Sequence, residues 1–393
     1  MTRYAENLNM QPAISRFKWR QIWLTLHLYV GLSFGFIFVL SGLTGSLLVF
    51  YVEIDELINP ELQISRESAT VPKSYEELFQ ALRVRHPERL KAWRLEIPRN
   101  NQAMMMARYY KPQETEHLHF APFIVWVNPY TANVVSSRFW GQYLMTWLYD
   151  LHYTLLLDLT GKTIMACIGG VILVSLLTGV YLWWPGPGKL KPALVFKGHT
   201  SRARFNFDLH KINGIYSLLF LFLLVISGIL LELPDFFNPG INKLSHLFKA
   251  KTHQSISQNG NQRISLDRAV DIALQRFPKA TLRWIETPVD VNGSYQIMLY
   301  QSGEPSRRFP KSTVWIDQYS GKVLDIRNPI NNSSGDTFLS WLHPLHSGEI
   351  AGLSGRWLVF LLGFIPAILF VTGLIRWLQK RDARNLKNTR NAI

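Results

Sequence analysis

Hydrophobic residues are unevenly distributed along the 393-residue chain, and four long apolar runs dominate the pattern. They cover residues 26–52, 163–184, 207–233 and 357–378. A helix of about 20 apolar residues spans a hydrocarbon core about 30 Å thick. Each run reaches this length, so the pattern predicts a bundle of four transmembrane helices. The first run is too long for a cleaved signal peptide and is interpreted as a retained helix.

The two long segments between these runs, residues 53–141 and 234–335, have the pattern of small folded modules. In the first, Ser74 and Glu77 have the spacing of a capping box before an amphipathic helix. In the second, Ser265 is expected to begin a similar helix. Short strands are predicted at 95–98, 104–109, 125–127 and 134–135, and again at 282–287, 295–300 and 314–324. We therefore expect two small α+β modules outside the membrane.

Two shorter segments adjoin the outer ends of the second and fourth runs. Residues 142–162 are predicted to form an interfacial helix, because a continuous helix from His152 to Trp184 would be about 48 Å long. The break is expected near Gly161. Residues 336–356 are the corresponding interfacial or outer part of the fourth helix.

The net charge of +15 is concentrated in three short segments. Residues 1–20, 185–206 and 376–393 hold fifteen Lys and Arg against two acidic residues, and so carry +13 of the +15. Each adjoins an apolar run, which is the positive-inside pattern and removes the main support for nucleic-acid binding. We therefore expect the N-terminus (1–25), the loop 185–206 and the C-terminus (379–393) to be cytoplasmic.

The second half of the chain repeats the first. Shifting residues 147–184 by 194 positions gives ten identities in 38, including His152 with His346. Other matched pairs are Trp147 and Trp341, Gly161 and Gly355, Thr178 and Thr372, and Gly179 and Gly373. Shifting the first run by 183 positions aligns His27 with His210. These matches predict a tandem duplication of parallel repeats, related by a pseudo-two-fold axis along the membrane normal.

Two pairs among the eleven histidines exchange under this duplication. His27 and His210 lie at the cytoplasmic starts of their helices, and His152 and His346 at the outer ends. Histidine in a membrane is costly and therefore indicates function, although interfacial or backbone-bonded histidines are the alternative. Two imidazoles from equivalent helices suit the axial ligation of haem b, so we expect two haems per chain. Zinc would need further ligands, and no Cys, Asp or Glu accompanies the pairs.

Further residues could complete these haem sites. His343 is a less favoured ligand than His346, because His343 aligns with Tyr149 in the repeat. Pro344 is expected in the first turn of a helix, with His343 at its boundary. Cations available to the haem carboxylates include Arg20, Arg204 and Lys211 on the inner side, and Lys162 and Arg356 on the outer side.

Glycines follow the inner pair by one helical turn. Gly31 comes after His27 and Gly214 after His210, and both would let a flat macrocycle approach the backbone. Core packing explains a lone glycine equally well. The single cysteine, Cys167, excludes an intrachain disulfide and the covalent haem-attachment motif.

Several motifs together resemble the PepSY-associated transmembrane family. They are Leu26–His27 with Gly31 and Gly45, Leu151–His152 through 178–185, the segments 208–214 and 345–349, and the modules' 125–131 and 314–321. The resemblance covers nearly the whole chain. Characterised members include inner-membrane di-haem ferric-siderophore reductases of Gram-negative bacteria, of the ferrioxamine reductase type.

That resemblance implies an oxidoreductase that passes electrons across the membrane to a ferric siderophore, of suspected hydroxamate type, in the periplasm. The electron donor would be a separate cytoplasmic reductant or a quinol. The outer haem edge, rather than a catalytic side chain, is expected to reduce the iron. Expected substrate contacts are Tyr143, Trp147, Trp341 and Ser347, with interfacial anchoring as the alternative. The competing hypothesis is a non-enzymatic membrane protein whose modules bind a peptidase or envelope partner.

Overall fold

The structure, a computed structural model, divides into two compact units. It describes residues 12–64, 71–197, 201–251, 253–256 and 262–391. The first unit consists of Met1–Ser46, Ile164–Ile229 and Leu358–Ile393, and the second of Leu47–Thr163 and Leu230–Trp357. Residues 1–11 of the predicted N-terminal segment lie outside the described residues. Each unit therefore combines segments from both halves of the sequence.

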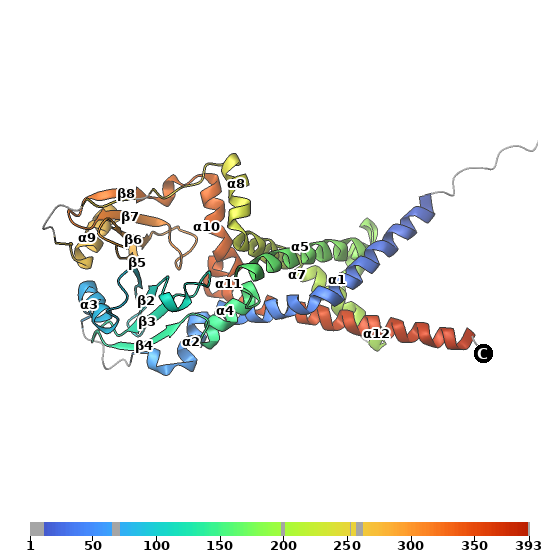
Figure 1. The fold of residues 1–393 in the computed structure, drawn as a ribbon. Coiled ribbons are helices and arrows are strands. Elements are labelled where there is room, and N and C mark those ends of the chain that lie inside the picture. The colour runs from blue at the N-terminus through green and yellow to red at the C-terminus, as the bar shows by residue number, and fades with distance from the viewer. Residues whose placement is uncertain (1–11, 65–70, 198–200, 252, 257–261, 392–393) are drawn as a thin grey trace, which may run out of the picture. The chain divides into compact units, whose positions relative to one another are not determined.

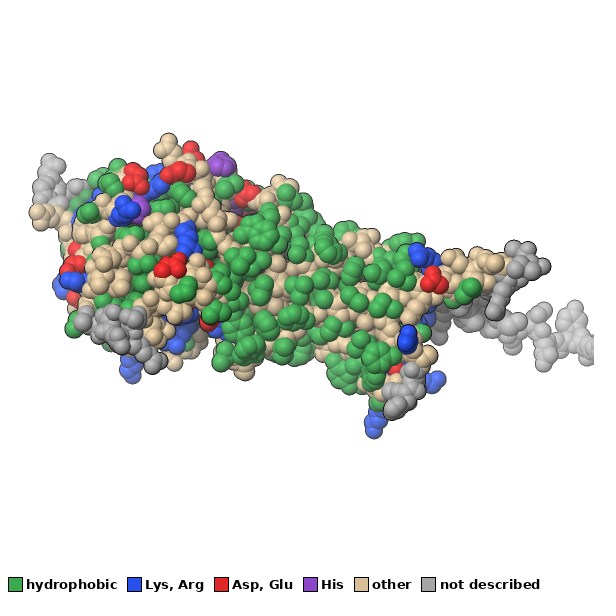
Figure 2. Space-filling view, turned by 90° about the horizontal axis from the view of Figure 1, so that it is seen from below, with side chains coloured by type: hydrophobic (Ala, Val, Ile, Leu, Met, Phe, Trp, Pro, Cys, Tyr) green, Lys and Arg blue, Asp and Glu red, His purple; other side chains and the backbone are tan. Residues whose placement is uncertain are grey.

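The described chain contains four helical segments long and apolar enough to cross a membrane. The helices are α1 (Pro12–Val49), α5 (Asp158–Trp183), α7 (Arg202–Glu232), and α11 (Gly352–Leu362) followed by α12 (Ile365–Asn391). Figure 2 shows hydrophobic side chains gathered over the long helices. The protein is therefore a multi-pass membrane protein. Helices α1 and α7 begin before the apolar runs 26–52 and 207–233, because their polar first turns continue the same helix.

The fourth span is broken in the middle of its apolar run, which the hydrophobic pattern does not predict. Pro366, the second residue of α12, lacks the N–H that would continue the helix from α11. Beside the break, the Ser46 hydroxyl of α1 donates a hydrogen bond to the carbonyl oxygen of Phe360 at 2.7 Å. A Cβ on Gly363 would lie 2.4 Å from the carbonyl oxygen of Gly42. The break therefore lies where the backbones of α1 and the fourth span are in close contact.

The second unit contains one eight-stranded sheet with the order β4-β3-β2-β1-β5-β6-β7-β8. Its strands are β1 (Trp93–Glu96), β2 (Met105–Tyr109), β3 (Phe123–Val127), β4 (Val134–Phe139), β5 (Thr281–Glu286), β6 (Ser294–Tyr300), β7 (Ser312–Asp317) and β8 (Val323–Arg327). The two predicted modules share this single sheet, which the sequence pattern does not predict. Strands β1 and β5 pair antiparallel, with Leu95 opposite Ile285. This pairing satisfies two strand edges that separate modules would leave open.

Two helices, α3 (Tyr75–Arg85) and α9 (Leu266–Arg276), pack on one face of this sheet (Figure 1). Ser74 and Ser265 cap them, as the sequence predicts. Each helix also caps the other. The Asp267 carboxylate accepts hydrogen bonds from the backbone N–H groups of Tyr75 and Glu76, at 2.9 and 3.0 Å. The Glu76 carboxylate accepts one from the N–H of Leu266 at 2.9 Å. These reciprocal caps join the two modules a second time.

Shorter helices complete the structure. They are α2 (Tyr51–Ile58), α4 (Leu144–Thr154), α8 (Pro234–Leu244) and α10 (Ser334–His346), while α6 (Leu190–Ala193) lies in the loop before α7. Turns of 3-10 helix cover Pro60–Leu62, Gln113–Thr115, Pro187–Lys189, Pro329–Asn331 and Glu349–Ala351. An aromatic cluster that includes Tyr51, Trp126 and Trp140 fills the space between α2, α4 and β3.

Helix α4 is separate from α5, so the helix from His152 to Trp184 is not continuous. The break lies at Leu155 and Leu156, both in the left-handed region, rather than near Gly161. Gly161 instead packs on the end of α4, because a Cβ there would lie 1.6 Å from the carbonyl oxygen of Thr154. Its repeat partner Gly355 packs in the same way on the backbone that follows α10.

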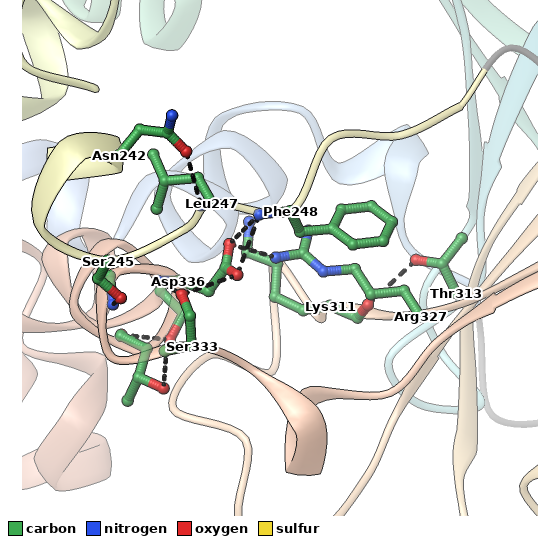
Figure 3. A network of polar contacts seen from close by, with 12 residues as sticks. Asn242, Ser245, Leu247, Phe248, Lys311, Thr313, Arg327, Ser333 and Asp336 are labelled. Carbon is green, nitrogen blue, oxygen red and sulfur yellow. Dashed lines mark hydrogen bonds and ion pairs between the residues drawn. The ribbon is translucent and has the colours of Figure 1, made fainter. Parts of the chain in front are cut away.

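A carboxylate network holds the start of α10 (Figure 3). Asp336 accepts hydrogen bonds from the backbone N–H of Phe248 at 3.1 Å, the Ser333 hydroxyl at 3.1 Å and the Arg327 guanidinium at 3.2 Å. The side chain of Asp336 is buried. It therefore ties α10 to β8 and to the segment after α8, and so fixes the helix that carries His343 and His346.

Candidate functional site

The first candidate site is formed by His27 on α1 and His210 on α7. Their ring centroids are 6.4 Å apart and their planes are nearly perpendicular, at 89°. Residues 183 positions apart in the sequence therefore lie next to each other, with their rings in a T-shaped arrangement. We refer to His27 and His210 as the inner pair.

Both rings of the inner pair are held through Nδ1. His27 Nδ1 lies 3.1 Å from the Ser175 carbonyl oxygen and 3.1 Å from Thr178 Oγ1, both on α5. His210 Nδ1 lies 2.9 Å from Thr372 Oγ1 on α12. Each threonine hydroxyl already donates its proton to a backbone carbonyl of its own helix. The threonine oxygens can therefore only accept, so Nδ1 is protonated in both histidines and Nε2 carries the lone pair.

The residue after each threonine is a glycine, and the ring packs against it. A Cβ on Gly179 would lie 3.3 Å from Cε1 of His27, and one on Gly373 would lie 3.5 Å from Cε1 of His210. The Thr-Gly dipeptides match in the sequence repeat, and they make the same contact with the two histidines.

The second candidate site is formed by His152 on α4 and His346, the last residue of α10. Their ring centroids are 6.2 Å apart, with an interplanar angle of 56°. We refer to these residues as the outer pair. The expectation that Pro344 begins the helix carrying His346 is wrong. The cap by Ser333 starts α10 earlier, and Pro344 sits in its last turn, where its missing N–H removes a single helical hydrogen bond.

The spacing of both pairs fits a metal held between two imidazoles. A metal lies about 2 Å from a ligating nitrogen and the nitrogen about 1 Å from its ring centroid, so two centroids across a metal are separated by about 6 Å. Packed aromatic rings also occur at this distance. In the inner pair, protonation of Nδ1 leaves the lone pair of Nε2 available to bind a metal, which packing alone does not require. Within the described residues, no group of three or more His, Cys, Asp or Glu could hold a metal ion. The donor set therefore suits a cofactor that brings its own equatorial ligands.

Space beside the inner pair is consistent with a flat cofactor. A Cβ on Gly31 would meet no atom within 4 Å. One on Gly214 would meet only the Leu369 side chain, at 3.6 Å. The space and the two imidazoles at the inner pair therefore fit a haem.

The predicted inner cations are engaged within the protein. Arg20 donates to the carbonyl oxygen of Leu182 at 3.1 Å. Arg204 and Lys211 form ion pairs with the fully buried carboxylate of Asp208, at 3.1 and 3.0 Å. Of these three cations, Arg20 is the one without a carboxylate partner within the described chain.

Of the predicted outer cations, Arg356 forms ion pairs with Glu53 at 2.8 Å and donates to the Val49 carbonyl oxygen at 2.7 Å. The ring of His343 packs edge-on against Phe309, with centroids 4.6 Å apart. Its Nδ1 is buried without a hydrogen-bond partner in the described chain. Burial lowers the pKa of His343 to about 3, and the positive charge of Arg308 adds to this effect. His343 is therefore neutral.

The four predicted substrate residues differ in exposure. Tyr143 is 9% exposed and its hydroxyl is hydrogen-bonded to that of Tyr51 at 3.0 Å, so it is a core residue rather than the lining of a cleft. Trp147 and Trp341 are 42% and 44% exposed, respectively. Ser347 is half-buried at the end of α10, where its hydroxyl accepts from the N–H of Glu349 at 3.4 Å.

The side chains that position these histidines were not assigned a role from the sequence. Thr178 and Thr372 were visible as a matched pair in the repeat, which was the available signal. Arg308 and Glu349 carry no such signal, because their importance depends on contacts between segments far apart in the chain.

The comparisons with known proteins agree with the motifs. The family described as PepSY-associated TM region matches residues 24–380, which include both histidine pairs and the whole sheet. No curated protein matches the chain significantly. The match extends over far more than half of the sequence, so this chain belongs to the PepSY-associated transmembrane family.

Proposed function

We propose that this protein is a di-haem b membrane cytochrome that reduces ferric chelates. The observation that carries the proposal is the inner pair, in which two imidazoles about 6 Å apart both present Nε2. The outer pair has nearly the same spacing and comes from positions matched by the 194-residue shift. A tandem duplication that places one haem in each unit accounts for both observations.

The basic segments give this proposal a direction. By the positive-inside rule the termini and the loop 185–206 would be cytoplasmic and the sheet unit would lie on the opposite side of the membrane. The resemblance to characterised members implies that this membrane is the inner membrane of a Gram-negative bacterium, with the sheet unit in the periplasm. Electrons would enter from a cytoplasmic reductant or a quinol and leave on the sheet side. A ferric siderophore, of hydroxamate type in the characterised members that the motifs resemble, is the proposed acceptor. Reduction to ferrous iron weakens a hard-oxygen chelate and releases the metal for uptake.

The protein side chains would act by holding and tuning the cofactor. Bound haem b supplies a one-electron carrier. His27 and His210 would hold the inner haem, and His152 and His346 the outer one. The accepting hydroxyls of Thr178 and Thr372 keep Nδ1 protonated, fix the ring orientation and raise the basicity of Nε2.

The first test is cofactor content. Protein purified from haem-replete cells should be red, with the reduced-minus-oxidised bands of low-spin haem b. A pyridine haemochrome assay should approach two haems per chain. Colourless protein would overturn the proposal and favour a non-enzymatic protein whose sheet unit binds a peptidase or envelope partner.

The second test determines the direction of electron transfer across the membrane. Purified protein is oriented in liposomes, its haems are reduced from the side of the termini, and ferrioxamine with a ferrous trap is added on the sheet side. Rapid haem reoxidation with trapped ferrous iron is expected. Oxidation by the chelate from the side of the termini alone would contradict the proposed direction.

A further inference from the structure

An arginine in the sheet unit lies between the two helices that carry the outer pair. Arg308 belongs to the loop that joins β6 to β7. Its guanidinium carbon is 5.4 Å from the ring centroid of Tyr51 and 5.5 Å from that of Phe309. The Phe309 ring packs on His343 at 4.6 Å, and the Tyr51 ring lies 6.5 Å from that of Tyr149. The aromatic neighbours of Arg308 therefore reach both α10 and α4.

The two positions that they reach are equivalent. Tyr149 and His343 align under the 194-residue shift, and each lies three residues before a histidine of the outer pair. Three residues correspond to about 4.5 Å along a helix. Tyr149 and His343 are thus each about one helical turn from a histidine of the outer pair, and the aromatic neighbours of Arg308, Tyr51 and Phe309, contact these two matched positions.

The Arg308 backbone is fixed by the segment that follows His346. The Glu349 carboxylate accepts hydrogen bonds from the Arg308 N–H at 3.1 Å, the Arg307 N–H at 2.7 Å and the Ser306 hydroxyl at 2.9 Å. A single carboxylate therefore couples the β6–β7 loop to the end of α10. The backbone at Arg308 is therefore anchored to the segment that follows His346.

Two polar groups at this place lack a partner. Among the residues that the structure describes, no acceptor bonds the guanidinium of Arg308, which makes only the two ring contacts. His343 Nδ1 is buried and also has no hydrogen-bond partner in the described part of the chain. A half-buried guanidinium and a buried imidazole nitrogen normally find hydrogen-bond acceptors, so both point to a ligand that carries them.

We propose that Arg308 and His343 form a carboxylate-binding site for the acidic side chains of the outer haem. This inference rests on the proposed function. A carboxylate is the acceptor that a planar guanidinium pairs with best, and a neutral imidazole can donate to it through Nδ1. Arg356, the cation expected from the sequence, is already paired with Glu53. Arg308 takes the role that the sequence interpretation gave to Arg356.

The test compares iron protoporphyrin IX with its dimethyl ester, which has the same ring and iron but no free carboxylate. Apoprotein is reconstituted with each, and transfer of haem to excess apomyoglobin is followed at the spectral component that His152→Ala removes. Arg308→Leu should weaken retention of protoporphyrin IX at the outer site by roughly 10- to 100-fold. It should leave retention of the ester unchanged. The inner haem of the same molecules reports that the variant is folded.

The matched control is Arg307→Leu. Arg307 is the adjacent, exposed arginine, and its guanidinium stacks on the Tyr300 ring, 5.6 Å from the centroid. Its replacement should leave both haems unchanged. His343→Phe keeps the aromatic contact with Phe309 and should weaken retention of protoporphyrin IX, but not of the ester, by a smaller factor than Arg308→Leu.

Several outcomes would overturn the inference. Equal weakening of haem and ester by Arg308→Leu would show a role unrelated to carboxylates. Unchanged haem retention with a raised KM for an anionic ferric chelate would show that the cation serves the substrate. Wild-type protein that takes up no haem would defeat the proposed function itself, and so is distinguishable from a failure of this inference.

Discussion

Thr178 and Thr372 hold two different histidines in the same way. Each hydroxyl donates to its own helix and accepts from the Nδ1–H of a histidine on another helix, at 3.1 Å for His27 and 2.9 Å for His210. Both threonines are buried, at 5% and 3% exposure. They are positioning residues in the proposed inner haem site.

Replacing either threonine should therefore alter the inner haem. Thr372→Val removes the side-chain acceptor of His210 Nδ1 while keeping the shape, and should lower inner-haem affinity by roughly 10- to 100-fold. A less electron-rich imidazole should also raise the reduction potential, measured by spectroelectrochemistry. Thr372→Ser should restore both values, and Thr163→Val, at an exposed position of α5, should change neither. An unchanged potential in Thr372→Val would contradict the positioning role.

Histidine replacement should affect the two haems in pairs. His27→Ala and His210→Ala should remove the same spectral component, because their ring centroids are 6.4 Å apart. His152→Ala and His346→Ala should remove the other component. His343→Ala should retain both components, because His343 is not a proposed ligand, although the outer haem should be held less tightly. Loss of one component by His27→Ala and His152→Ala alike would show that the pairing is wrong.

The contact between α1 and the fourth span should depend on glycine. Gly363→Val would place a Cβ 2.0 Å from Ser46 Oγ and 2.4 Å from the Gly42 carbonyl oxygen, so the helices must separate. Overpacking of this kind costs about 1–3 kcal/mol, and Tm should fall by several degrees. Gly170→Val is the control, since a Cβ there meets nothing within 4 Å. Equal Tm values for the two variants would exclude a tight contact.

The Asp336 network should be required for the outer pair but not for the inner one. Asp336→Ala leaves the Arg327 guanidinium without its carboxylate and removes the ties of α10 to β8. Breaking a buried pair in this way typically costs about 3–5 kcal/mol. Outer-haem content should fall while inner-haem content persists, as measured by spectra of the purified protein. Asp382→Ala, at an exposed site beside Arg381, should be neutral.

Asp55 should make stability depend on pH. Burial raises the pKa of Asp55 to about 6, with Arg138 opposing and Glu61 adding to the shift. The folded state therefore keeps a proton that the unfolded state has lost between about pH 4 and 6, so stability falls as pH rises through this window. Asp55→Asn should raise Tm by several degrees near pH 8 and have little effect near pH 4. A loss of stability near pH 8 would show that the charged carboxylate is favourable.

Elements set by local chemistry were predictable from the sequence. Long apolar runs predict the membrane spans, because the thickness of the hydrocarbon core fixes helix length. The caps at Ser74 and Ser265 predict the starts of α3 and α9, because a hydroxyl satisfies the first free N–H groups of a helix. The repeat placed the four histidines in matched positions, although their use as haem ligands stays a prediction.

Relations between distant segments were decided by the tertiary structure. The pairing of β1 with β5 depends on open strand edges, which no hydrophobic pattern records. The break before Pro366 depends on Ser46 and Gly42 of another helix, which satisfy a carbonyl and leave room for the backbone. In the sequence, nothing distinguishes Arg308 from other arginines in loops. Its place between Tyr51 and Phe309 follows from the hydrogen bonds of Glu349, because a side chain acquires such a partner only when the folded chain brings the two segments together.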